Sequence, residues 1–264
     1  MSQDRAFSVF TGLPAYTAAV AELPVSAALA KNVRGAVAVV PGTGDWWQGM
    51  LAARAGGAAA VVLADPAVLK RGAIDPKQWP GDIPVIVERP RLRPDVVADA
   101  VAARRGSPAR IITVECAAPA AGLGALICDG FGWMRSLAGG AVALQSSIAT
   151  VHSRIALLDA GDSQGGTVPA TLSATSIGGF HPGGLLQVLA LGEVRTEVTV
   201  DQPAGLARVE TATEEGVLRA PEHYESSARL ALRRAIDAHR AEGPGADLEE
   251  LLQDMALTRA LLDA

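Results

Sequence analysis

The chain has 264 residues, of which 49% are hydrophobic and 19% are charged, and its formal net charge is -5 at pH 7. This composition excludes a disordered chain, and the length corresponds to about two domains of roughly 150 residues each. The charged residues form no basic run, which argues against a nucleic-acid partner, and the longest apolar run (58–64) is far shorter than the about 20 residues that span a membrane. Cys116 and Cys128 stand apart in apolar surroundings, which favours buried reduced thiols in a cytoplasmic protein.

The N-terminal part of the chain alternates short β-type runs with alanine-rich stretches of helical spacing. Three of the runs are continuously apolar, as strands buried on both faces of a parallel sheet are. Pro94 fits the first turn of one helix, where its missing N–H is no loss. The pattern predicts a βαβ series with a parallel sheet. The predicted strands cover residues 7–10, 36–40, 60–63, 83–87 and 110–114, and the predicted helices cover 46–56 and 94–105.

After residue 115 the sequence changes to longer strand-like segments that are separated by Gly, Pro and Asp clusters. Such spacing is typical of hairpins in a mostly antiparallel sheet. The chain then closes with two predicted helices at 222–241 and 248–262, and Asp247 with Glu250 forms a predicted capping box for the second. The predicted strands cover residues 144–158, 167–177, 185–191 and 194–200.

These patterns predict an α/β fold with a Rossmann-like nucleotide-binding domain over residues 1–114 and an α+β domain over residues 115–264. The second domain is expected to have an open, mostly antiparallel sheet, and the two C-terminal helices are expected to return to the first domain. About 30 residues separate the first strand from the strand at 36–40, where a complete nucleotide-binding domain would need another strand–helix pair. The first domain is therefore expected to be truncated.

Two loops are candidates for holding a dinucleotide, because a glycine-rich turn between a strand and a helix brings backbone amides to a pyrophosphate. The loop after the first strand supplies Gly12 but then a proline. The loop at 41–47 supplies Gly42 and Gly44, and Asp65 closes the next strand at a distance that suits a ribose contact. Tryptophan replaces the third glycine of this pattern, and an aspartate at the helix start would repel a phosphate. An ordinary turn is therefore the alternative interpretation.

Two further patterns are candidate catalytic signals. Residues 161–165 match the nucleophile elbow of serine hydrolases around Ser163, but a strand-like segment follows instead of the required helix, which favours a polar hairpin turn. His181, in a segment rich in Gly and Pro, is either a turn residue or an acid–base group. The histidines and cysteines share no metal-ligand spacing, and no metal site is expected.

Four segments resemble motifs of the Gfo/Idh/MocA family of oxidoreductases. Residues 34–41 are similar to the family's strand that runs into an A-T-P loop, and residues 83–90, Ile-Pro-Val-Ile-Val-Glu-Arg-Pro, are similar to its strand ending in E-K-P. Residues 124–139 resemble the segment that carries a histidine and ends in R-W-L-x-G, and the helix pair at 224–262 resembles the C-terminal d-A-I-x-x-G and closing helix. The order of the elements along the chain is also similar to that family.

The resemblance implies a site from which this sequence departs at the proton-moving groups. Members of the family transfer hydride between a nicotinamide cofactor and a sugar, cyclitol or similar polyol, with the E-K-P lysine and a histidine near the substrate carbonyl. Here Arg89 replaces that lysine, and no histidine occurs from Asp129 to Arg135. A guanidinium is a poor proton donor at neutral pH, although it can hold a carboxylate or phosphate. The candidate catalytic residues are Arg89, Asp129 and His181, and the candidate cofactor contacts are Gly12, Gly42, Gly44, Asp65 and Glu88.

These departures favour a degenerate member of the family: a non-catalytic binding or accessory subunit of a sugar or polyol oxidoreductase system, without a cofactor. The alternative is an active NAD- or NADP-dependent oxidoreductase acting on a sugar, cyclitol or related polyol, in which Arg89 orients an acidic substrate and Asp129 or His181 moves the proton. Residues 185–191 are apolar on both faces of the predicted strand, so another copy of the chain or a catalytic relative is expected to cover the sheet. A small polar or acidic ligand is a further expected partner.

Overall fold

The structure, a computed structural model, describes residues 6–79, 81, 83–162, 165–178, 183–241 and 246–263. The chain forms two compact units, and each takes residues from two separate stretches of the sequence. The first unit comprises Met1–Pro90 and Tyr224–Leu252, and the second unit comprises Arg91–His223 and Gln253–Ala264. The first unit holds a parallel sheet and the second a mostly antiparallel sheet, so the predicted α/β fold is confirmed.

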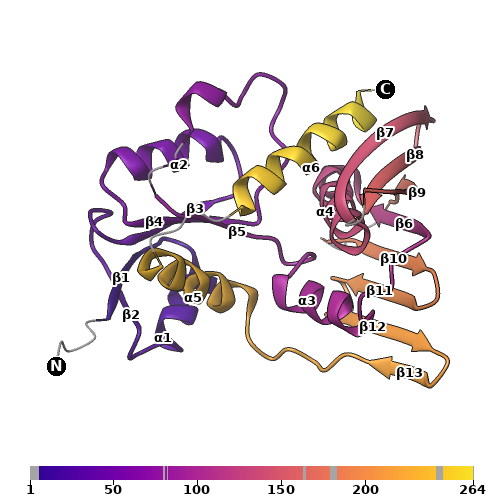
Figure 1. The fold of residues 1–264 in the computed structure, drawn as a ribbon. Helices are drawn as coiled ribbons and strands as arrows, with labels where there is room; N and C mark the ends of the chain where they lie inside the picture. Colours follow the sequence, from indigo (N-terminus) through magenta and orange to yellow (C-terminus); the bar gives the residue numbers. More distant parts are fainter. Residues whose placement is uncertain are drawn as a thin grey trace. The chain divides into compact units, whose positions relative to one another are not determined.

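Five short strands form the parallel sheet of the first unit, in the order β2-β1-β3-β4-β5 (Figure 1). This is the order of the doubly wound sheet, 3-2-1-4-5-6, without its strand 3, because the chain passes from β2 directly to β3 on the other side of β1. The predicted truncation is thus the loss of one edge strand with its helix. The strands are β1 (Phe7–Phe10), β2 (Ala27–Leu29), β3 (Val37–Pro41), β4 (Ala60–Ala64) and β5 (Val85–Glu88).

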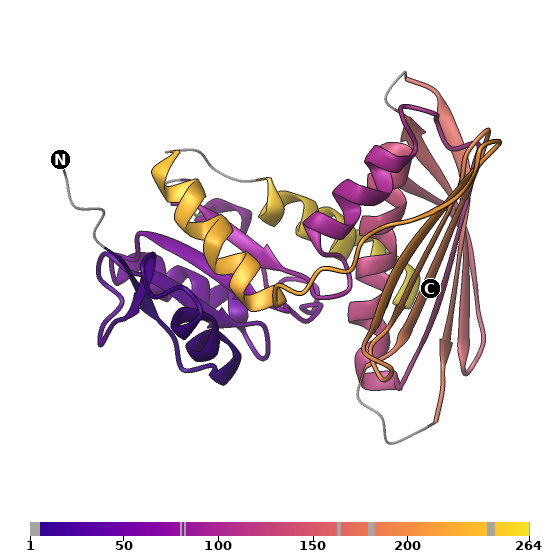
Figure 2. The same cartoon turned by 90° about the horizontal axis from the view of Figure 1, so that it is seen from below.

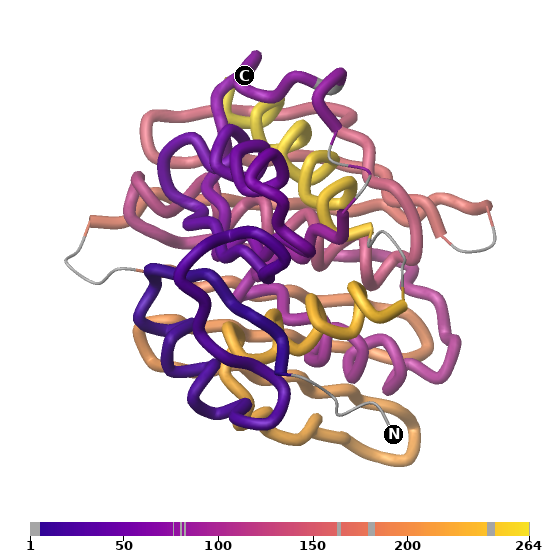
Figure 3. The backbone as a smooth tube through the Cα atoms, turned by 90° about the vertical axis from the view of Figure 1, so that its left-hand side faces the viewer, coloured from indigo at the N-terminus to yellow at the C-terminus, as the bar shows by residue number. Residues whose placement is uncertain are grey.

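Helices cover both faces of the parallel sheet. The helix α2 (Trp46–Ala55) packs on β3 and β4, while α5 (Ser227–Arg240) packs on β3, β4 and β5 from the opposite face, beside α1 (Pro14–Ala21). The tube view in Figure 3 shows α5, in amber, near the indigo N-terminal segment, although the two are far apart in the sequence. Leu232 and Ala235 of α5 are buried in one core with side chains of β1, β3, β4 and β5. This core fixes the strand ends that carry the candidate site.

The edge strand β5 has one of its outward amides capped by a side chain. The backbone N–H of Val87 donates to Oδ2 of Asp247 over 3.0 Å, and Arg234 donates two hydrogen bonds to the same carboxylate, at 2.9 and 2.8 Å. Asp247 is the first residue of α6 (Asp247–Leu262) rather than its cap. The predicted capping box of Asp247 with Glu250 is therefore wrong, because the carboxylate protects the edge of the sheet instead.

Eight strands form the sheet of the second unit, in the order β13-β12-β11-β10-β6-β9-β8-β7. All neighbouring strands are antiparallel except β6 and β9, which are parallel. The segment 110–114, predicted to be the last strand of the parallel sheet, lies instead in β6, between β9 and β10. The strands are β6 (Ile111–Ala118), β7 (Gly139–Ala149), β8 (Ser153–Asp162), β9 (Thr167–Ser176), β10 (Leu185–Leu191), β11 (Arg195–Asp201), β12 (Leu206–Thr213) and β13 (Gly216–Arg219).

Helices cover only one face of the eight-stranded sheet within the described part of the chain. The helices α3 (Pro94–Ala103) and α4 (Ala120–Ala138) lie on that face, as Figure 2 shows. In β10 every second residue from Leu186 is buried, whereas the alternating residues from Leu185 onward stay partly or fully exposed. The predicted open sheet is confirmed. Among the described helices, none combines the length and apolar character that a membrane crossing requires.

Candidate functional site

The carboxyl ends of the parallel strands meet at one edge of the first-unit sheet, which we call the carboxyl edge. The next two strands of the chain, β2 and β3, lie on opposite sides of β1, so the position between β1 and β3 is the switch point at which doubly wound sheets bind ligands. The structure places all five residues predicted to contact a cofactor along this edge. Gly12 follows β1, Gly42 and Gly44 follow β3, Asp65 follows β4, and Glu88 ends β5.

The loop between β1 and α1 offers few amides to a phosphate. The N–H of Leu13 donates to Oγ1 of Thr11 over 3.1 Å, and the next residue, Pro14 at the start of α1, has no N–H. A Cβ on Gly12 would meet no atom within 4 Å, so this glycine is not required by a close approach of the protein's own backbone. In dinucleotide-binding folds the N-terminus of this helix holds the pyrophosphate with backbone N–H groups. In this chain, neither Leu13 nor Pro14 offers such a group to a ligand.

Gly42, in the loop between β3 and α2, is held by the protein's own backbone. Its N–H donates to the carbonyl of Ala64 and its carbonyl accepts from the N–H of Ala67, both over 2.8 Å. A Cβ on Gly42 would lie 2.3 Å from the carbonyl oxygens of Ala64 and Asp65. Asp65 itself takes a left-handed conformation, with φ of 46°. This close approach of the two loops is sufficient to require a glycine at position 42, and no bound ligand is needed to explain it.

The N-terminus of α2 is capped by a carboxylate from its own chain. Oδ1 of Asp45 accepts a hydrogen bond from the N–H of Gln48 over 3.1 Å. This negative charge occupies the end of the helix dipole at which a phosphate would bind. The side chain of Trp47, which stands at the third glycine position of the pattern, is fully buried. The residues of the carboxyl edge therefore do not fit a dinucleotide held at a helix N-terminus.

Tyr16 and Glu88 form a contact that ties α1 to the end of β5. The hydroxyl of Tyr16 donates to Oε2 of Glu88 over 2.7 Å, and the tyrosine is 1% exposed. Burial raises the pKa of Tyr16 far above its ordinary value, and the charges of Glu88 and Asp65 raise it further. Sequence reasoning missed this residue because α1 itself was not predicted. Glu88, predicted to contact a cofactor, holds a buried hydroxyl of its own chain.

The raised pKa of Tyr16 predicts a loss of stability at alkaline pH. The folded state keeps the phenol protonated, so its contribution is complete below about pH 10 and is lost as the pH rises above the pKa of the unfolded tyrosine. We expect Tyr16→Phe to cost about 1 to 2 kcal/mol at neutral pH, because the hydrogen bond from the Tyr16 hydroxyl to Glu88 is lost. Above about pH 10, the free energy of unfolding of the variant should fall less steeply with pH than that of the wild type. The difference in slope should reach up to about 1.4 kcal/mol per pH unit. Urea unfolding from about pH 8 to pH 11 measures both effects.

Tyr224→Phe is the matched control for this experiment, since Tyr224 is 92% exposed. The buried thiol of Cys116, whose pKa is also raised by burial, contributes equally to both variants and cancels in the comparison. Equal pH slopes for Tyr16→Phe and the wild type would show that Tyr16 ionises freely in the folded state.

Asp129, predicted to move a proton, is part of a buried ion pair in the second unit. Its Oδ2 lies 2.5 Å from Nε of Arg91, and the two residues are 3% and 7% exposed. Arg91 also donates to Oε1 of Gln202 over 3.3 Å, and its carbonyl accepts from Nε1 of Trp133 over 2.8 Å. A carboxylate held in this way is a structural anion, and Arg91 is the partner that sequence reasoning missed.

The remaining predicted residues have simpler outcomes. Arg89 follows β5 and is 8% exposed, so its guanidinium does not point into bulk solvent. His181 and Ser163 lie outside the described residues. Within the described ranges, no group of three or more His, Cys, Asp or Glu side chains is arranged to hold a metal ion.

The sequence matches no protein-family profile and no curated protein, but the fold matches solved structures over nearly the whole chain. An oxidoreductase from Sinorhizobium meliloti superposes with a TM-score of 0.67 at 13% identity, over 99% of this chain and 97% of that chain. UDP-N-acetylglucosamine 3-dehydrogenase GnnA from Acidithiobacillus ferrooxidans gives a TM-score of 0.61 at 11% identity, over 98% and 97%. KijD10, a 3-ketoreductase from Actinomadura kijaniata in complex with TDP-benzene and NADP, gives 0.58 at 12% identity, over 98% and 88%.

The chain has the fold of the Gfo/Idh/MocA-type oxidoreductases. Within this fold, the segment that resembles the E-K-P motif closes β5 with Glu88 and Arg89. The segment that resembles the histidine-bearing stretch lies in α4, where Asp129 is paired with Arg91. At both places, this chain has side chains that differ from the acid–base groups that the resemblance implies.

Proposed function

We propose that this chain is a non-catalytic member of the Gfo/Idh/MocA-type fold, serving as a binding or accessory subunit of a sugar or polyol oxidoreductase system. The observation that carries the proposal is the state of the two helix N-termini at the carboxyl edge. Pro14 removes an amide from α1, and Asp45 caps α2 with a negative charge. A phosphate at either position would lose hydrogen bonds or meet repulsion.

The side chains at the two positions where the resemblance implies acid–base groups also support this proposal. A guanidinium at position 89 keeps its proton at neutral pH, so it can orient an anion but cannot supply a proton to a developing alkoxide. Oδ2 of Asp129 would have to leave Nε of Arg91 before that oxygen could accept a proton. The buried cysteines Cys116 and Cys128 form no disulfide, which is consistent with the reducing cytoplasm that we propose as the location of the protein.

An active oxidoreductase is the second candidate, and one feature of the β2 end favours it. In doubly wound sheets the residues after the second strand recognise the adenosine ribose, and basic side chains there accept a 2′-phosphate. Lys31 and Arg34 follow β2 and are exposed. KijD10 is described in complex with NADP, and GnnA is a UDP-N-acetylglucosamine dehydrogenase. An active form of this chain would thus prefer NADP to NAD and act on a sugar derivative.

Titration with NADPH and NADH separates the two candidates. We expect the dissociation constants of both to be weaker than about 1 mM by calorimetry, because the loops supply few free amides. Saturable binding in the low micromolar range would contradict the non-catalytic proposal. In that case Lys31→Ala and Arg34→Ala should weaken NADPH binding and leave NADH binding unchanged, since only NADPH carries the 2′-phosphate.

We also propose that the open sheet face is covered by a second subunit. Ile155, Leu157 and Ile111 are 50%, 52% and 40% exposed on strands of this sheet. Covering such a patch removes apolar surface from water, and symmetric pairing of two copies is the simplest arrangement. A hetero-complex with a catalytic relative is the alternative partner.

Light scattering tests the pairing of two copies. We expect a mass of about twice 27.0 kDa at micromolar concentration, and a monomer of unchanged circular dichroism for Leu157→Arg, because a buried charge opposes pairing. Val25→Arg is the control, since Val25 is 81% exposed in the first unit. A monodisperse wild-type protein of 27.0 kDa would contradict the pairing of two copies, and a catalytic relative would then be the proposed partner.

A further inference from the structure

The residues from Pro221 to Tyr224, which we call the connecting segment, lead the chain from β13 in the second unit to α5 in the first unit. All four residues are exposed. Their backbone makes no hydrogen bond within the described part of the chain, whereas Ala220 before them donates to the carbonyl of Val209 over 3.0 Å. The position of the connecting segment therefore depends on its side chains.

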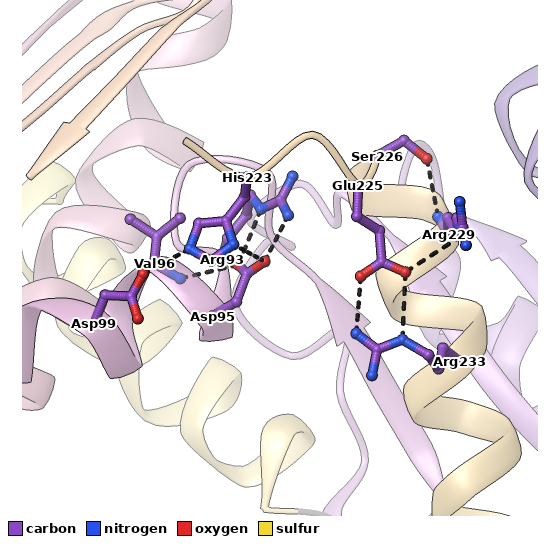
Figure 4. Close-up of polar contacts among 9 residues, drawn as sticks. All are labelled: Arg93, Asp95, Val96, Asp99, His223, Glu225, Ser226, Arg229 and Arg233. Carbon is purple, nitrogen blue, oxygen red and sulfur yellow. Dashed lines mark hydrogen bonds and ion pairs between the residues drawn. The ribbon is translucent and has the colours of Figure 1, made fainter. Parts of the chain in front are cut away.

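His223 carries the polar contacts of this segment, and both nitrogens of its ring face carboxylates of α3. Nε2 lies 2.7 Å from Oδ2 of Asp99, and Nδ1 lies 3.4 Å from Oδ2 of Asp95, as Figure 4 shows. The two aspartates stand four residues apart, so they share one face of the helix. The side chain of His223 is 28% exposed, which shields these contacts partly from water.

The two carboxylates differ in their other partners. Arg93 donates two hydrogen bonds to Asp95, at 3.0 and 2.6 Å, and the N–H of Val96 donates a third over 2.9 Å. Burial raises the pKa of Asp95, but the hydrogen bonds and charge of Arg93 bring it below its usual value. For Asp99, His223 is the hydrogen-bond partner within the part of the chain that the structure describes. Asp99 therefore depends on the histidine more than Asp95 does.

The charged neighbours of His223 in the chain do not take part in these contacts. Glu225 pairs with Arg229 and Arg233 of α5, at 3.5 and 2.8 Å. Glu222 is exposed and makes no ion pair with a described residue. The charged groups that face the histidine are thus the two aspartates of α3, with an arginine behind the first of them.

The chemistry of the imidazole ring makes this arrangement sensitive to pH. A neutral ring has one N–H, so it donates to one carboxylate and turns the lone pair of its other nitrogen toward the second. A protonated ring donates from both nitrogens. Both contacts of His223 are therefore favourable together only when the ring carries its second proton. Histidine changes its charge between about pH 5 and 8, whereas aspartates in general titrate near about pH 4.

We propose that His223 is a pH-sensitive anchor, which holds the connecting segment against α3 when its ring is protonated and releases the segment when the ring loses that proton. The residues on either side are held by other means: Ala220 by the backbone of β12, and Glu225 by α5. With the anchor closed, Tyr224 lies between two held residues. With the anchor open, the segment 221–224 has no polar contact to hold it. This inference goes beyond the proposed function, because it involves neither the carboxyl edge nor the open sheet face.

Carbon-detected NMR relaxation of the connecting segment tests the proposal, because it does not depend on exchangeable amide protons. We expect the backbone order parameters of residues 221–224 to fall from about 0.85 at pH 5.5 to below about 0.6 at pH 8.5. The midpoint should coincide with the change in the ring nitrogen shifts of His223. A ring that keeps one charge state over this range, or order that stays constant while the ring loses its proton, would overturn the proposal.

Two variants and one control assign the pH dependence to this ring. His223→Gln can donate to one carboxylate but cannot gain a charge, so its segment should be mobile at both pH values. His223→Arg has a fixed charge and N–H groups for both carboxylates, so its segment should stay ordered at both. His152→Gln removes an exposed histidine from another turn of the second unit and should keep the wild-type response. Equal order of His223→Gln and the wild type at pH 5.5, or loss of the response in His152→Gln, would contradict a role of His223 as the anchor.

Discussion

Replacing Asp129 with asparagine is expected to lower the free energy of unfolding by about 3 to 5 kcal/mol, because it removes a carboxylate charge that lies in direct contact with the buried guanidinium of Arg91. The ion pair is 2.5 Å long, and both side chains are less than 9% exposed. Arg91 also donates to Gln202 at 3.3 Å, but this contact is to a neutral oxygen and cannot replace a carboxylate. Urea unfolding followed by tryptophan fluorescence measures the loss.

Two further variants distinguish a structural anion from a catalytic one. Glu193→Gln removes a carboxylate from an exposed pair with Arg110, at 3.9 Å, and should cost less than about 0.5 kcal/mol. The double variant Arg91→Met with Asp129→Leu should recover most of the lost stability, because both charges leave the core together. A fully stable Asp129→Asn variant would instead favour the alternative in which Asp129 serves the reaction.

Sequence reasoning located the elements whose pattern is set by their own residues. The runs at β3, β4 and β5 are continuously apolar because both faces of the parallel sheet are covered by helices, and this burial is visible in the sequence. The helix α1 was missed, since its eight residues are apolar on nearly every side and show no amphipathic pattern.

Elements whose position depends on distant partners could not be assigned in the same way. The strand β6 has an ordinary alternating pattern, and nothing local shows that it pairs with β9 and β10 rather than with β5. The contacts of Tyr16 with Glu88 and of Arg91 with Asp129 join residues 72 and 38 positions apart. A glycine pattern can be recognised in the sequence, but the sequence does not show whether the glycine makes room for a ligand or, as at Gly42, for the protein's own backbone.

The second prediction of large effect concerns Gly42, because the protein's own backbone leaves no room for a side chain at this position. We expect Gly42→Ala to lower the free energy of unfolding by about 3 kcal/mol, since overpacking against rigid groups costs this much. The new Cβ would lie 2.3 Å from the carbonyl oxygens of Ala64 and Asp65. These oxygens belong to backbone at the end of β4, which cannot move away without disturbing its pairing with β3.

Gly12→Ala is the matched control, since Gly12 is another of the three glycines predicted to contact a cofactor. A Cβ there meets nothing within 4 Å and Gly12 has no left-handed φ, so its unfolding free energy should stay within about 0.5 kcal/mol of the wild type. Thermal and urea unfolding of the two variants give the comparison directly. Equal stability of Gly42→Ala and Gly12→Ala would mean that the loop at position 42 yields to a side chain, and the reason for its glycine would then have to be sought in a bound ligand. A large difference assigns Gly42 to the fold, and the candidate glycines at which a Cβ would meet no other atom of the protein are then Gly12, after β1, and Gly44, after β3.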